Sequence, residues 1–356
     1  MIPFERPGRR AAGATFPVAI FAAALAAVLL AACTATASPS PSGPAPTGSI
    51  APAATGTPTA PPETEPTVEI PVEAVFPVTV TDDEGTDVTI ESEPQRIVSL
   101  TPATTEILFA IGAGDRQVGR TDADDYPPEA TDLPVVVKLG KVDVEKIVGL
   151  EPDLVLAGGN NFTPPEAVAK LREVGIPVVV VYAPDVEGVF EDVELVGTVA
   201  GAPGPASELA DGMRAEIDAV AAVLGPGERA RPRVFYETGD QPKLYGIADD
   251  SPYAEMISLA GGEPITTGSA TNWEMPLETL IAADPEVVVL GDSVYGVTAE
   301  QVAARPGWDV ITAVRTNAIR PVNDTVITRP GPRLVEGLRA LALAIDPQAP
   351  LPSPAP

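Results

Sequence analysis

The hydrophobic pattern of this chain contains one unit that occurs twice. VDVEKIVGLEPDLVL begins at Val142, and MPLETLIAADPEVVV begins at Met275. Each copy first places apolar residues at helical spacing and then runs through Val and Leu, as a strand buried on both faces does. A proline between the two parts disfavours helical geometry in the residue before it. Each copy is therefore predicted to be a helix, a turn and a buried strand, and the repeat predicts two similar lobes.

A glutamate occupies the same place in the first turn of both predicted helices. These residues are Glu145 and Glu278, and their neighbours Lys146 and Thr279 differ in type. A carboxylate near a helix N-terminus is stabilised by the helix dipole, which is a sufficient explanation for either glutamate taken alone. The presence of the acid in both copies favours a functional role that the two lobes share.

Short apolar runs alternate with amphipathic stretches through the rest of the folded region. Two alternating runs on either side of Gly85 predict a hairpin. Beyond it, a helix is expected to begin at Thr104, and alternation of strands and helices predicts an α/β fold with central parallel sheets. The other predicted helices are 164–174, 253–259, 299–304 and 332–345, and the predicted strands are 96–100, 117–121, 176–182, 234–237 and 318–321.

One long helix is predicted between the two halves, from Ala206 to Leu224. Its apolar residues fall on one face, and at 1.5 Å per residue it is about 28 Å long, enough to join two lobes. The predicted organisation is therefore two similar lobes joined by one long helix, with a ligand cleft between them. The expected boundaries are 75–205 for the N-terminal lobe, 206–226 for the linking helix, 227–347 for the C-terminal lobe and 348–356 for a disordered tail.

The first 32 residues have the pattern of a secretory signal. Three arginines precede an apolar run over residues 16–30, and small residues then lead to Cys33, as in a bacterial lipoprotein signal. The apolar run is shorter than the roughly 20 residues that a membrane-spanning helix needs. We therefore expect lipid attachment at Cys33 and an extracytoplasmic protein that is anchored to the cell membrane.

Residues 33–74 are rich in Pro, Ser, Thr, Ala and Gly and show no apolar periodicity. Such a segment buries too little apolar surface to order itself, and its prolines favour extended conformations. No lysine or arginine occurs between Arg10 and Arg96, so the segment has no basic group for anionic lipid. We expect it to be a disordered tether.

Charge and composition exclude several classes of function. The chain has 22 basic and 50 acidic residues, a net charge of -28, which disfavours nucleic acid and anionic membrane surfaces as partners. It has no histidine and a single cysteine, which excludes imidazole-dependent triads, histidine ligation of haem and a disulfide framework. Direct coordination of a metal would need Tyr, Asp or Glu oxygens, so we expect a metal complex to be bound through its organic shell.

Ligands of open α/β sheets bind beyond the carboxyl ends of the strands. Trp273, Tyr126 and Tyr245 follow such ends in polar, turn-rich sequence and are expected to contact a ligand, whereas Tyr182 and Tyr236 end buried strands and are expected in the core. Aromatic side chains offer a large contact area at low entropic cost, which suits a bulky ligand. The full set expected near the cleft is Thr101, Tyr126, Asn160, Asn161, Phe162, Tyr182, Tyr236, Tyr245, Trp273 and Tyr295.

Several motifs resemble those of the vitamin B12 and iron-siderophore substrate-binding proteins of ABC importers, the helical-backbone (class III) periplasmic binding proteins. The resemblance covers residues 76–345. The motifs are RIVSLTPATTEILFAIGAG from Arg96, DYPPEA from Asp125, GKVDVEKIVGLEPDLVLA from Gly140, NWEMPLETLIAADPEVVVL from Asn272, RPGW from Arg305 and RPGPRL from Arg329.

This resemblance implies a lipid-anchored, monomeric substrate-binding protein that captures a corrinoid or a ferric siderophore and delivers it to a permease with its ATPase. In the family, one glutamate from each lobe binds arginines of the permease, and here these match Glu145 and Glu278. Tyr126 and Trp273 resemble aromatics that surround the corrin, although Leu139 stands where cobalamin binders have tryptophan. Arg329 would either meet an anionic ferric chelate or pair with a surface acid. The expected ligand-binding residues are Thr101, Tyr126, Asn160, Tyr245, Trp273 and Arg329.

Two other functions use the same scaffold. Gly291-Asp292-Ser293 resembles the nucleophile turn of a hydrolase, but the chain has no histidine to activate the serine. An ancillary receptor for a sensor is the other alternative. The expectation is a binding protein without catalytic residues, metal site or resident cofactor.

Overall fold

Two parallel sheets, one in each lobe, carry the fold of this protein. The computed structural model describes residues 75–160, 162–225, 230–249 and 251–354. The chain divides into units 1–66 and 67–356, and every described residue belongs to the second. The predicted signal peptide, Cys33 and the whole of the predicted tether lie outside the described residues, as does Asn161.

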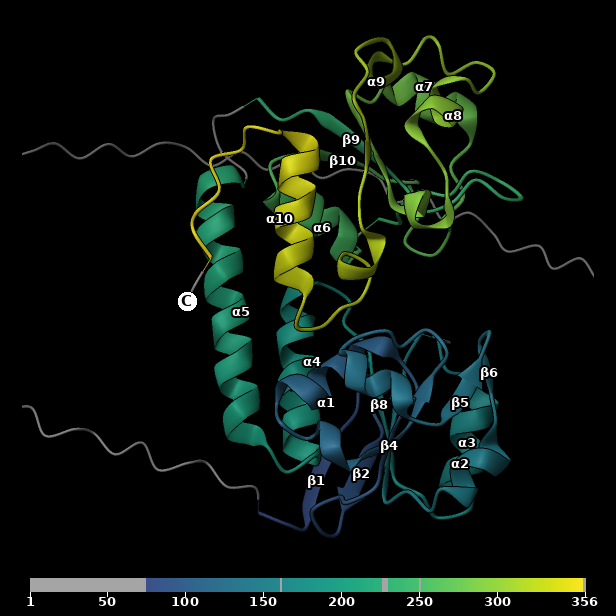
Figure 1. Cartoon of the computed structure of the whole chain (residues 1–356), viewed down its shortest axis with the longest axis vertical. Coiled ribbons are helices and arrows are strands. Elements are labelled where there is room, and N and C mark those ends of the chain that lie inside the picture. Colours follow the sequence, from purple (N-terminus) through teal and green to yellow (C-terminus); the bar gives the residue numbers. More distant parts are fainter. Residues whose placement is uncertain (1–74, 161, 226–229, 250, 355–356) are drawn as a thin grey trace, which may run out of the picture. The chain divides into compact units, whose positions relative to one another are not determined.

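The N-terminal lobe is built on a six-stranded sheet in the order β6-β5-β4-β3-β7-β8 (Figure 1). Its strands pair in parallel except for β5 and β6, which form an antiparallel hairpin, and β1 pairs with β2 in a separate hairpin. The strands are β1 Val78–Thr81, β2 Asp87–Ile90, β3 Ile97–Ser99, β4 Gln117–Thr121, β5 Val135–Lys138, β6 Lys141–Val142, β7 Leu154–Gly158 and β8 Val178–Val181. The helices are α1 Pro102–Ala110, α2 Val144–Gly149 and α3 Pro165–Glu173, with the short 3-10 helices η1 Gly114–Arg116 and η2 Pro128–Asp132.

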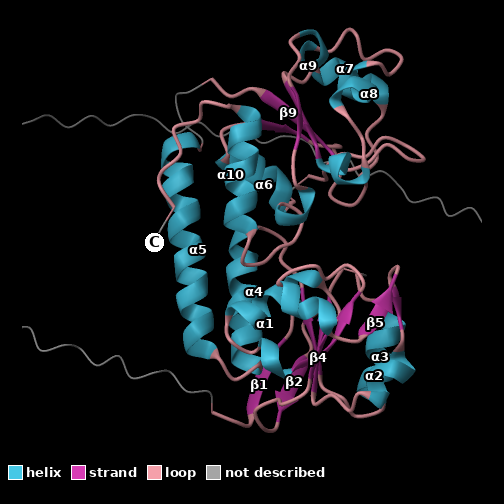
Figure 2. Ribbon diagram, in the orientation of Figure 1, coloured by secondary structure: helices cyan, strands magenta, loops and turns pink. Residues whose placement is uncertain are grey.

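The C-terminal lobe has a four-stranded parallel sheet in the order β10-β9-β11-β12. Helices lie around this sheet, as they do in the first lobe (Figure 2). The strands are β9 Arg233–Glu237, β10 Glu263–Ile265, β11 Val287–Leu290 and β12 Ile319–Pro321. The helices are α6 Pro252–Leu259, α7 Leu277–Ala283, α8 Ala299–Ala303, α9 Thr312–Arg315 and α10 Leu334–Ile345, with the 3-10 helices η3 Gly291–Tyr295 and η4 Asp324–Val326.

One long helix joins the lobes, as predicted, and a second helix packs against it. The long helix α5 spans Pro203–Leu224, three residues earlier at its start than the sequence indicates, because a proline fits the first turn of a helix. It packs against α4, Val186–Val199, which the sequence analysis does not predict. A Cβ on Gly197 of α4 would lie 2.1 Å from the Cβ of Ala206, so glycine allows the close crossing of these helices.

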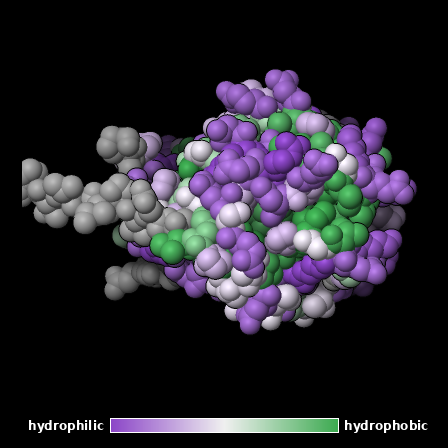
Figure 3. All heavy atoms as spheres, turned by 90° about the horizontal axis from the view of Figure 1, so that it is seen from below, coloured by the Kyte–Doolittle hydropathy of each residue, from purple (hydrophilic) through white to green (hydrophobic). Residues whose placement is uncertain are grey.

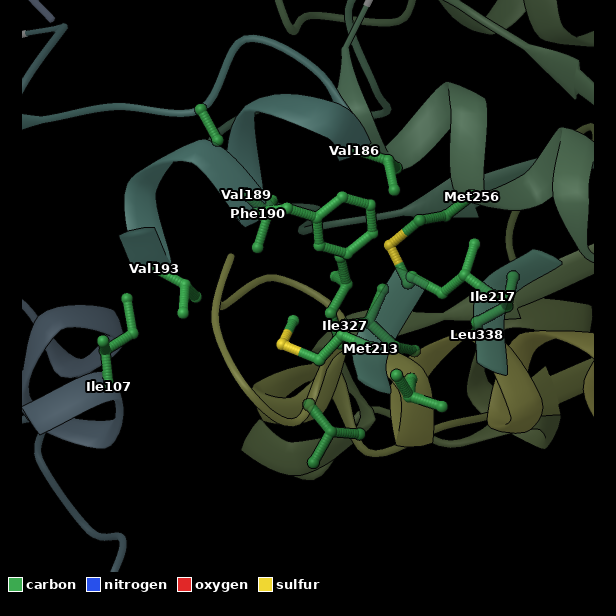
Figure 4. Packing of buried hydrophobic residues seen from close by; sticks show 14 of the residues in the cluster. Ile107, Val186, Val189, Phe190, Val193, Met213, Ile217, Met256, Ile327 and Leu338 are labelled. Carbon is green, nitrogen blue, oxygen red and sulfur yellow. The ribbon is translucent and has the colours of Figure 1, made fainter. Parts of the chain in front are cut away.

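Part of the hydrophobic core is shared by the two lobes, and a separate cluster lies within each lobe. One cluster of buried residues includes Ile97 of the first sheet, Val289 of the second and the inner faces of α4, α5, α6 and α10. Figure 4 shows Phe190 of α4 and Met213 of α5 among the side chains that meet there. The backbone N–H of Val186 also donates a hydrogen bond of 2.9 Å to Glu255 Oε2 of α6. A wide hinge motion would expose part of this cluster to water, which is unfavourable.

The sequence repeat is a structural repeat down to its turns. In the first lobe, Arg96 N–H donates to the carboxylate of Asp153, and in the second, Arg233 N–H donates to that of Glu286. In both copies a left-handed residue directly precedes the proline of the repeat, Glu151 with φ 50° and Asp284 with φ 44°. The prediction of two similar lobes is therefore confirmed.

Other differences from the sequence prediction are local. Helix α1 begins at Pro102 instead of Thr104, because Thr101 Oγ1 accepts the N–H of Thr104 and caps the helix. Strands β5, β6 and β10 and helix α9 are too short for a clear periodic signal. The expectation of a disordered tail is wrong for residues 348–354. Leu351 packs against the core, and Arg339 donates a hydrogen bond to the carbonyl of Pro352.

Candidate functional site

A cavity of about 610 Å³ lies between the two lobes at the carboxyl ends of their strands. The N-terminal lobe contributes the loops after β3, β7 and β8, represented by Thr101, Asn160 and Tyr182. The C-terminal lobe contributes the start of α6 and the segments around Trp273 and Arg329. Four of the six expected ligand-binding residues thus meet in one cavity: Thr101, Asn160, Trp273 and Arg329.

Aromatic rings from both lobes line this cavity. Trp273 lies edge-to-face against Tyr253, with ring centroids 5.9 Å apart, and keeps about a third of its surface exposed. On the opposite lobe, Asn160 Nδ2 donates a hydrogen bond of 3.1 Å to the hydroxyl of Tyr182. Phe162 follows, and 72% of its surface is exposed. The cavity therefore offers flat apolar faces on two sides, which suits a bulky organic ligand.

Hydroxyl groups line the cavity at the start of α1. Thr101 Oγ1 lies 2.9 Å from Thr104 Oγ1, and the latter lies 2.6 Å from Ser99 Oγ. A Cβ on Gly158 would lie only 2.6 Å from Thr101 Cγ2. Glycine at the end of β7 therefore lets Thr101 sit close to the sheet, and its hydroxyl is fixed there by the helix cap.

Arg329 is engaged with acids of the other lobe. Its Nη1 donates to Glu106 Oε1 at 3.2 Å and also to Asp125 Oδ1, and its Nη2 donates to the carbonyl of Ala123 at 3.0 Å. Burial alone would raise the pKa of the Asp125 carboxyl, but the hydrogen bond and charge of Arg329 outweigh it and lower the pKa. Of the two sequence interpretations of Arg329, the structure shows the ion pair.

Two expected ligand-binding residues do not line this cavity. Tyr126 lies under the guanidinium of Arg333, whose carbon is 4.3 Å from the ring centroid. Tyr245 forms backbone bridges with Gly239 and Glu274 at the edge of the second lobe. Both remain predictions as ligand contacts, but the geometry gives Tyr126 a different role, in which it helps to hold Arg333 against the first lobe.

The remaining aromatic predictions divide in two. Tyr236 is fully buried, as expected, and its hydroxyl donates to the carboxylate of Asp324. Tyr182 was expected in the core, yet it lines the cavity. Tyr295 is 83% exposed and lies outside the cavity wall. The end of a strand alone does not distinguish these environments, because the outcome depends on which loop covers that end.

Tyr253 and Asp192 are among the residues of the cavity wall that were not predicted from the sequence. Asp192 lies on α4, the unpredicted helix, and only 4% of its surface is exposed. Burial raises the pKa of its carboxyl to about 9, and the neighbouring Asp83 carboxylate adds to the rise. Asp192 is therefore protonated at neutral pH. Tyr253 directly follows Ser251 and Pro252, which begin helix α6. This helix start is the sequence signal that places Tyr253 near a loop.

Glu145 and Glu278 occupy equivalent exposed positions on the two lobes. Each lies in the first turn of its helix, α2 or α7, as predicted. Within the part of the chain that the structure describes, neither carboxylate forms a hydrogen bond or ion pair. Both are thus free to bind basic groups of another molecule.

The hydrolase-like turn does not have the geometry of a nucleophile. Gly291–Tyr295 forms η3, and the hydroxyl of Ser293 donates to the carbonyl of Val322 at 2.9 Å. Burial and the nearby Glu237 raise the pKa of Asp292 to about 7. No side chain in the sequence can act as an imidazole base, so this turn gives no support to the hydrolase alternative.

Residues 75–160, 162–225, 230–249 and 251–354 contain neither a helix that could cross a membrane nor a cluster suited to a metal ion. No helix in these ranges combines the length and apolar character that crossing a bilayer requires. The same ranges hold no cluster of three or more Asp, Glu, His or Cys side chains arranged to bind a metal ion. Figure 3 shows that the end of the folded unit at the N-terminal lobe is covered mainly by hydrophilic side chains.

Comparison with known proteins identifies relatives over most of the chain. Residues 97–324 match the family model described as "Periplasmic binding protein". The uncharacterized ABC transporter substrate-binding lipoprotein YvrC of Bacillus subtilis is 35% identical over 279 residues, 77% of this chain and 87% of that protein. The cobalamin-binding protein of Halobacterium salinarum is 33% identical over 278 residues, covering 76% of this chain and 74% of the relative.

A solved structure has the same fold. The periplasmic heme-binding protein RhuT from Roseiflexus sp. RS-1, in its apo form, is 28% identical and superposes with a TM-score of 0.63. The superposition covers 72% of this chain and 99% of the other. Relatives of this chain thus include proteins named for two different kinds of metal chelate.

Proposed function

Because this chain belongs to the periplasmic binding protein family, we propose that it is the extracytoplasmic substrate-binding component of an ABC importer for a metal chelate. The chelate class includes corrinoids, haem and ferric siderophores, which are the ligand types of the relatives and of the resembled family. In this proposal the protein captures the chelate in the cavity between its lobes. It then delivers the chelate to a permease, which an ATPase drives.

The observation that carries the proposal is the cavity itself. Its volume of about 610 Å³ lies within the range of small-molecule sites, and its walls combine aromatic faces with a few fixed hydroxyl and amide groups. Trp273 and Tyr253 face it from one lobe, and Tyr182 and Asn160 from the other. A ligand there contacts both lobes at once, so its binding favours a single relative position of the two lobes.

The surface supports delivery to a membrane partner. Glu145 and Glu278 are exposed on separate lobes, and no described residue pairs with them. One exposed ion pair contributes at most about 1 kcal/mol, but two widely spaced pairs fix the orientation of a rigid body and increase its association rate. The hydrophobic cluster that both lobes share supports the assumption that the protein docks as one rigid body.

We further propose that Cys33 carries a lipid and that residues 33–74 tether the folded unit to the membrane surface. The support is the order of the sequence, in which an apolar run, small residues, one cysteine and a Pro/Ser/Thr-rich segment follow one another. Replacement of Cys33 by alanine is expected to release the protein from washed cell membranes into the soluble extracytoplasmic fraction.

Cellular uptake of a labelled chelate tests the whole proposal. A strain that lacks this protein is expected to lose high-affinity uptake of cyanocobalamin or of a ferric siderophore, and expression of the full chain is expected to restore it. Expression of the Cys33→Ala variant is expected to restore it only partly, because the protein is diluted away from the permease. Uptake that is the same with and without the protein, for every chelate offered, would refute the proposal.

A further inference from the structure

The cavity wall carries very little positive charge that a ligand can use. Among the described residues that line it, the only basic side chain is that of Arg329, and the acidic side chains are those of Asp192 and Asp249. All other lining groups are hydroxyl, amide, aromatic or aliphatic. Whether the cavity accepts an anionic ligand therefore depends on the state of Arg329.

Arg329 is already neutralised by the opposite lobe. Its guanidinium contacts the carboxylates of Glu106 and Asp125, and Arg333 donates two further hydrogen bonds to Glu106, from Nε at 2.8 Å and from Nη2 at 2.6 Å. Two arginines and two acids give this cluster a net charge of zero. The Glu106 side chain is 1% exposed, so withdrawal of Arg329 towards a ligand would leave part of a buried charge without its partner.

The two acids of the wall do not attract an anion either. Asp192 is buried against Asp83 and holds a proton at neutral pH, so it offers a neutral hydrogen-bond donor. Asp249 accepts the N–H of Gly268 at 3.0 Å through Oδ1, so one of its oxygens already has a partner. The net charge of -28 on the whole chain adds a long-range field that repels anions from the cleft.

We infer that, within the proposed function, the cavity selects metal chelates without net negative charge and discriminates against chelates that carry ionised carboxylates. Suitable ligands have amide or hydroxamate peripheries that hydrogen-bond to hydroxyl and amide groups such as those of Thr101, Asn160 and Ser251. Haem, with two ionised propionates, and polycarboxylate ferric siderophores have no free cation to meet in this wall. This inference rests on the proposed function, since it names the charge class of the same ligand.

Matched ligand pairs test the inference directly. Calorimetric titration of the full protein with cyanocobalamin and with its monocarboxylic acids compares one corrin with and without a single negative charge. Ferrioxamine B and its succinylated derivative form a second pair, and haem is titrated alongside them. We expect the uncharged or cationic member of at least one pair to bind about tenfold more tightly than its anionic counterpart, with haem binding weakly or not at all.

The outcomes separate this inference from the proposed function. Equal or tighter binding of the anionic member, or tight binding of haem, overturns the charge selectivity while chelate binding stands. Absence of binding by every probe refutes the proposed function, and the inference fails with it.

A variant of Asp125 tests whether Arg329 is the origin of the charge selectivity. In Asp125→Asn, Arg329 loses one of its two acidic partners. The Asp125 side chain is 59% exposed, so we expect the change to have little effect on folding. The affinity ratio between neutral and anionic members is expected to fall several-fold, because Arg329 then carries uncompensated charge. Glu129→Gln is the control, since this exposed acid of the same lobe does not contact Arg329. An equal change of the affinity ratio in Asp125→Asn and Glu129→Gln would contradict the role of Arg329 in charge selectivity.

Discussion

Arg329 of the C-terminal lobe donates a hydrogen bond to Glu106 of the N-terminal lobe, with Nη1 3.2 Å from Oε1. Arg333 binds the same carboxylate through two nitrogens and lies over the ring of Tyr126. The lobes are thus held together at one end of the ligand cavity by a buried acid between two arginines. A ligand in the cavity would therefore meet an arginine that is already paired.

Glu106→Gln is expected to destabilise the protein by about 3–5 kcal/mol, because it leaves two largely buried arginines without their main acid. Urea unfolding followed by circular dichroism measures the loss. Glu93→Gln is the matched control, since the side chain of Glu93 is about half exposed and its ion pair with Arg116 contributes less than about 1 kcal/mol. A loss for Glu106→Gln no larger than that of the control would contradict the structural role of the cluster.

The pH dependence of stability is expected to contain a contribution from Asp192. Its folded-state pKa of about 9 lies above its ordinary value of 3.8, because of burial and the nearby Asp83 carboxylate. The contribution of this group is therefore complete below about pH 4 and is lost as the pH rises through 9. In Asp192→Asn this loss is absent, so the melting temperature of the variant relative to wild type is expected to rise between pH 5 and pH 9.

Thermal melts of wild type and Asp192→Asn at several pH values measure this difference. Glu208→Gln, which changes an exposed acid on α5, is expected to show a constant offset instead. A constant offset for Asp192→Asn as well would show that this carboxyl is ionised in the folded protein at neutral pH.

Trp273→Ala is expected to weaken chelate binding by at least about tenfold, because large aromatic side chains in the middle of a contact dominate its energy. Isothermal titration measures the dissociation constant, and circular dichroism checks the fold. Tyr295→Ala removes an equally prominent aromatic side chain that is 83% exposed and outside the cavity, and it should leave the affinity unchanged. Similar losses in both variants would place the ligand elsewhere on the surface.

The double change Glu145→Ala and Glu278→Ala is expected to abolish permease-dependent uptake without a change in ligand affinity, because both carboxylates are exposed and neither residue lines the cavity. Uptake assays in cells and titration of the purified protein separate the two effects. Glu166→Ala with Glu300→Ala is the matched control, since these exposed acids also lie in the first turns of helices, one in each lobe. Reduced affinity in the first double variant would contradict the docking role.

Repetition made much of the fold predictable from sequence. The two copies of the helix, turn and strand indicated two lobes, and the positions of Glu145 and Glu278 in them are as predicted. The expectation that a ligand binds beyond the carboxyl ends of the strands predicted a cleft, and the observed cavity contains Thr101, Asn160, Trp273 and Arg329. These features depend on local periodicity and on the general position of ligands in α/β sheets, both of which can be recognised in a single sequence.

The remaining features depend on contacts between residues far apart in the chain. Helix α4 contains glycines that weaken its local signal, and Gly197 is required by the crossing with Ala206. Arg329 and Glu106 are 223 positions apart in the chain, and no local sequence pattern indicates that they pair. The contact of the Tyr126 ring with Arg333 likewise joins residues of different lobes. Such partners are determined by how the lobes meet.

Titration of the intrinsic tryptophan fluorescence with chelates tests the central claim most directly. The chain has two tryptophans, Trp273 at the cavity and Trp308 buried in the second lobe. Cyanocobalamin or a neutral ferric hydroxamate is expected to quench the emission saturably, with one site and submicromolar affinity, after correction for ligand absorption. Trp273→Phe is expected to lose most of that signal. Emission that responds to no chelate beyond its absorption, in a protein shown to be folded, would contradict the claim that this cavity binds a metal chelate.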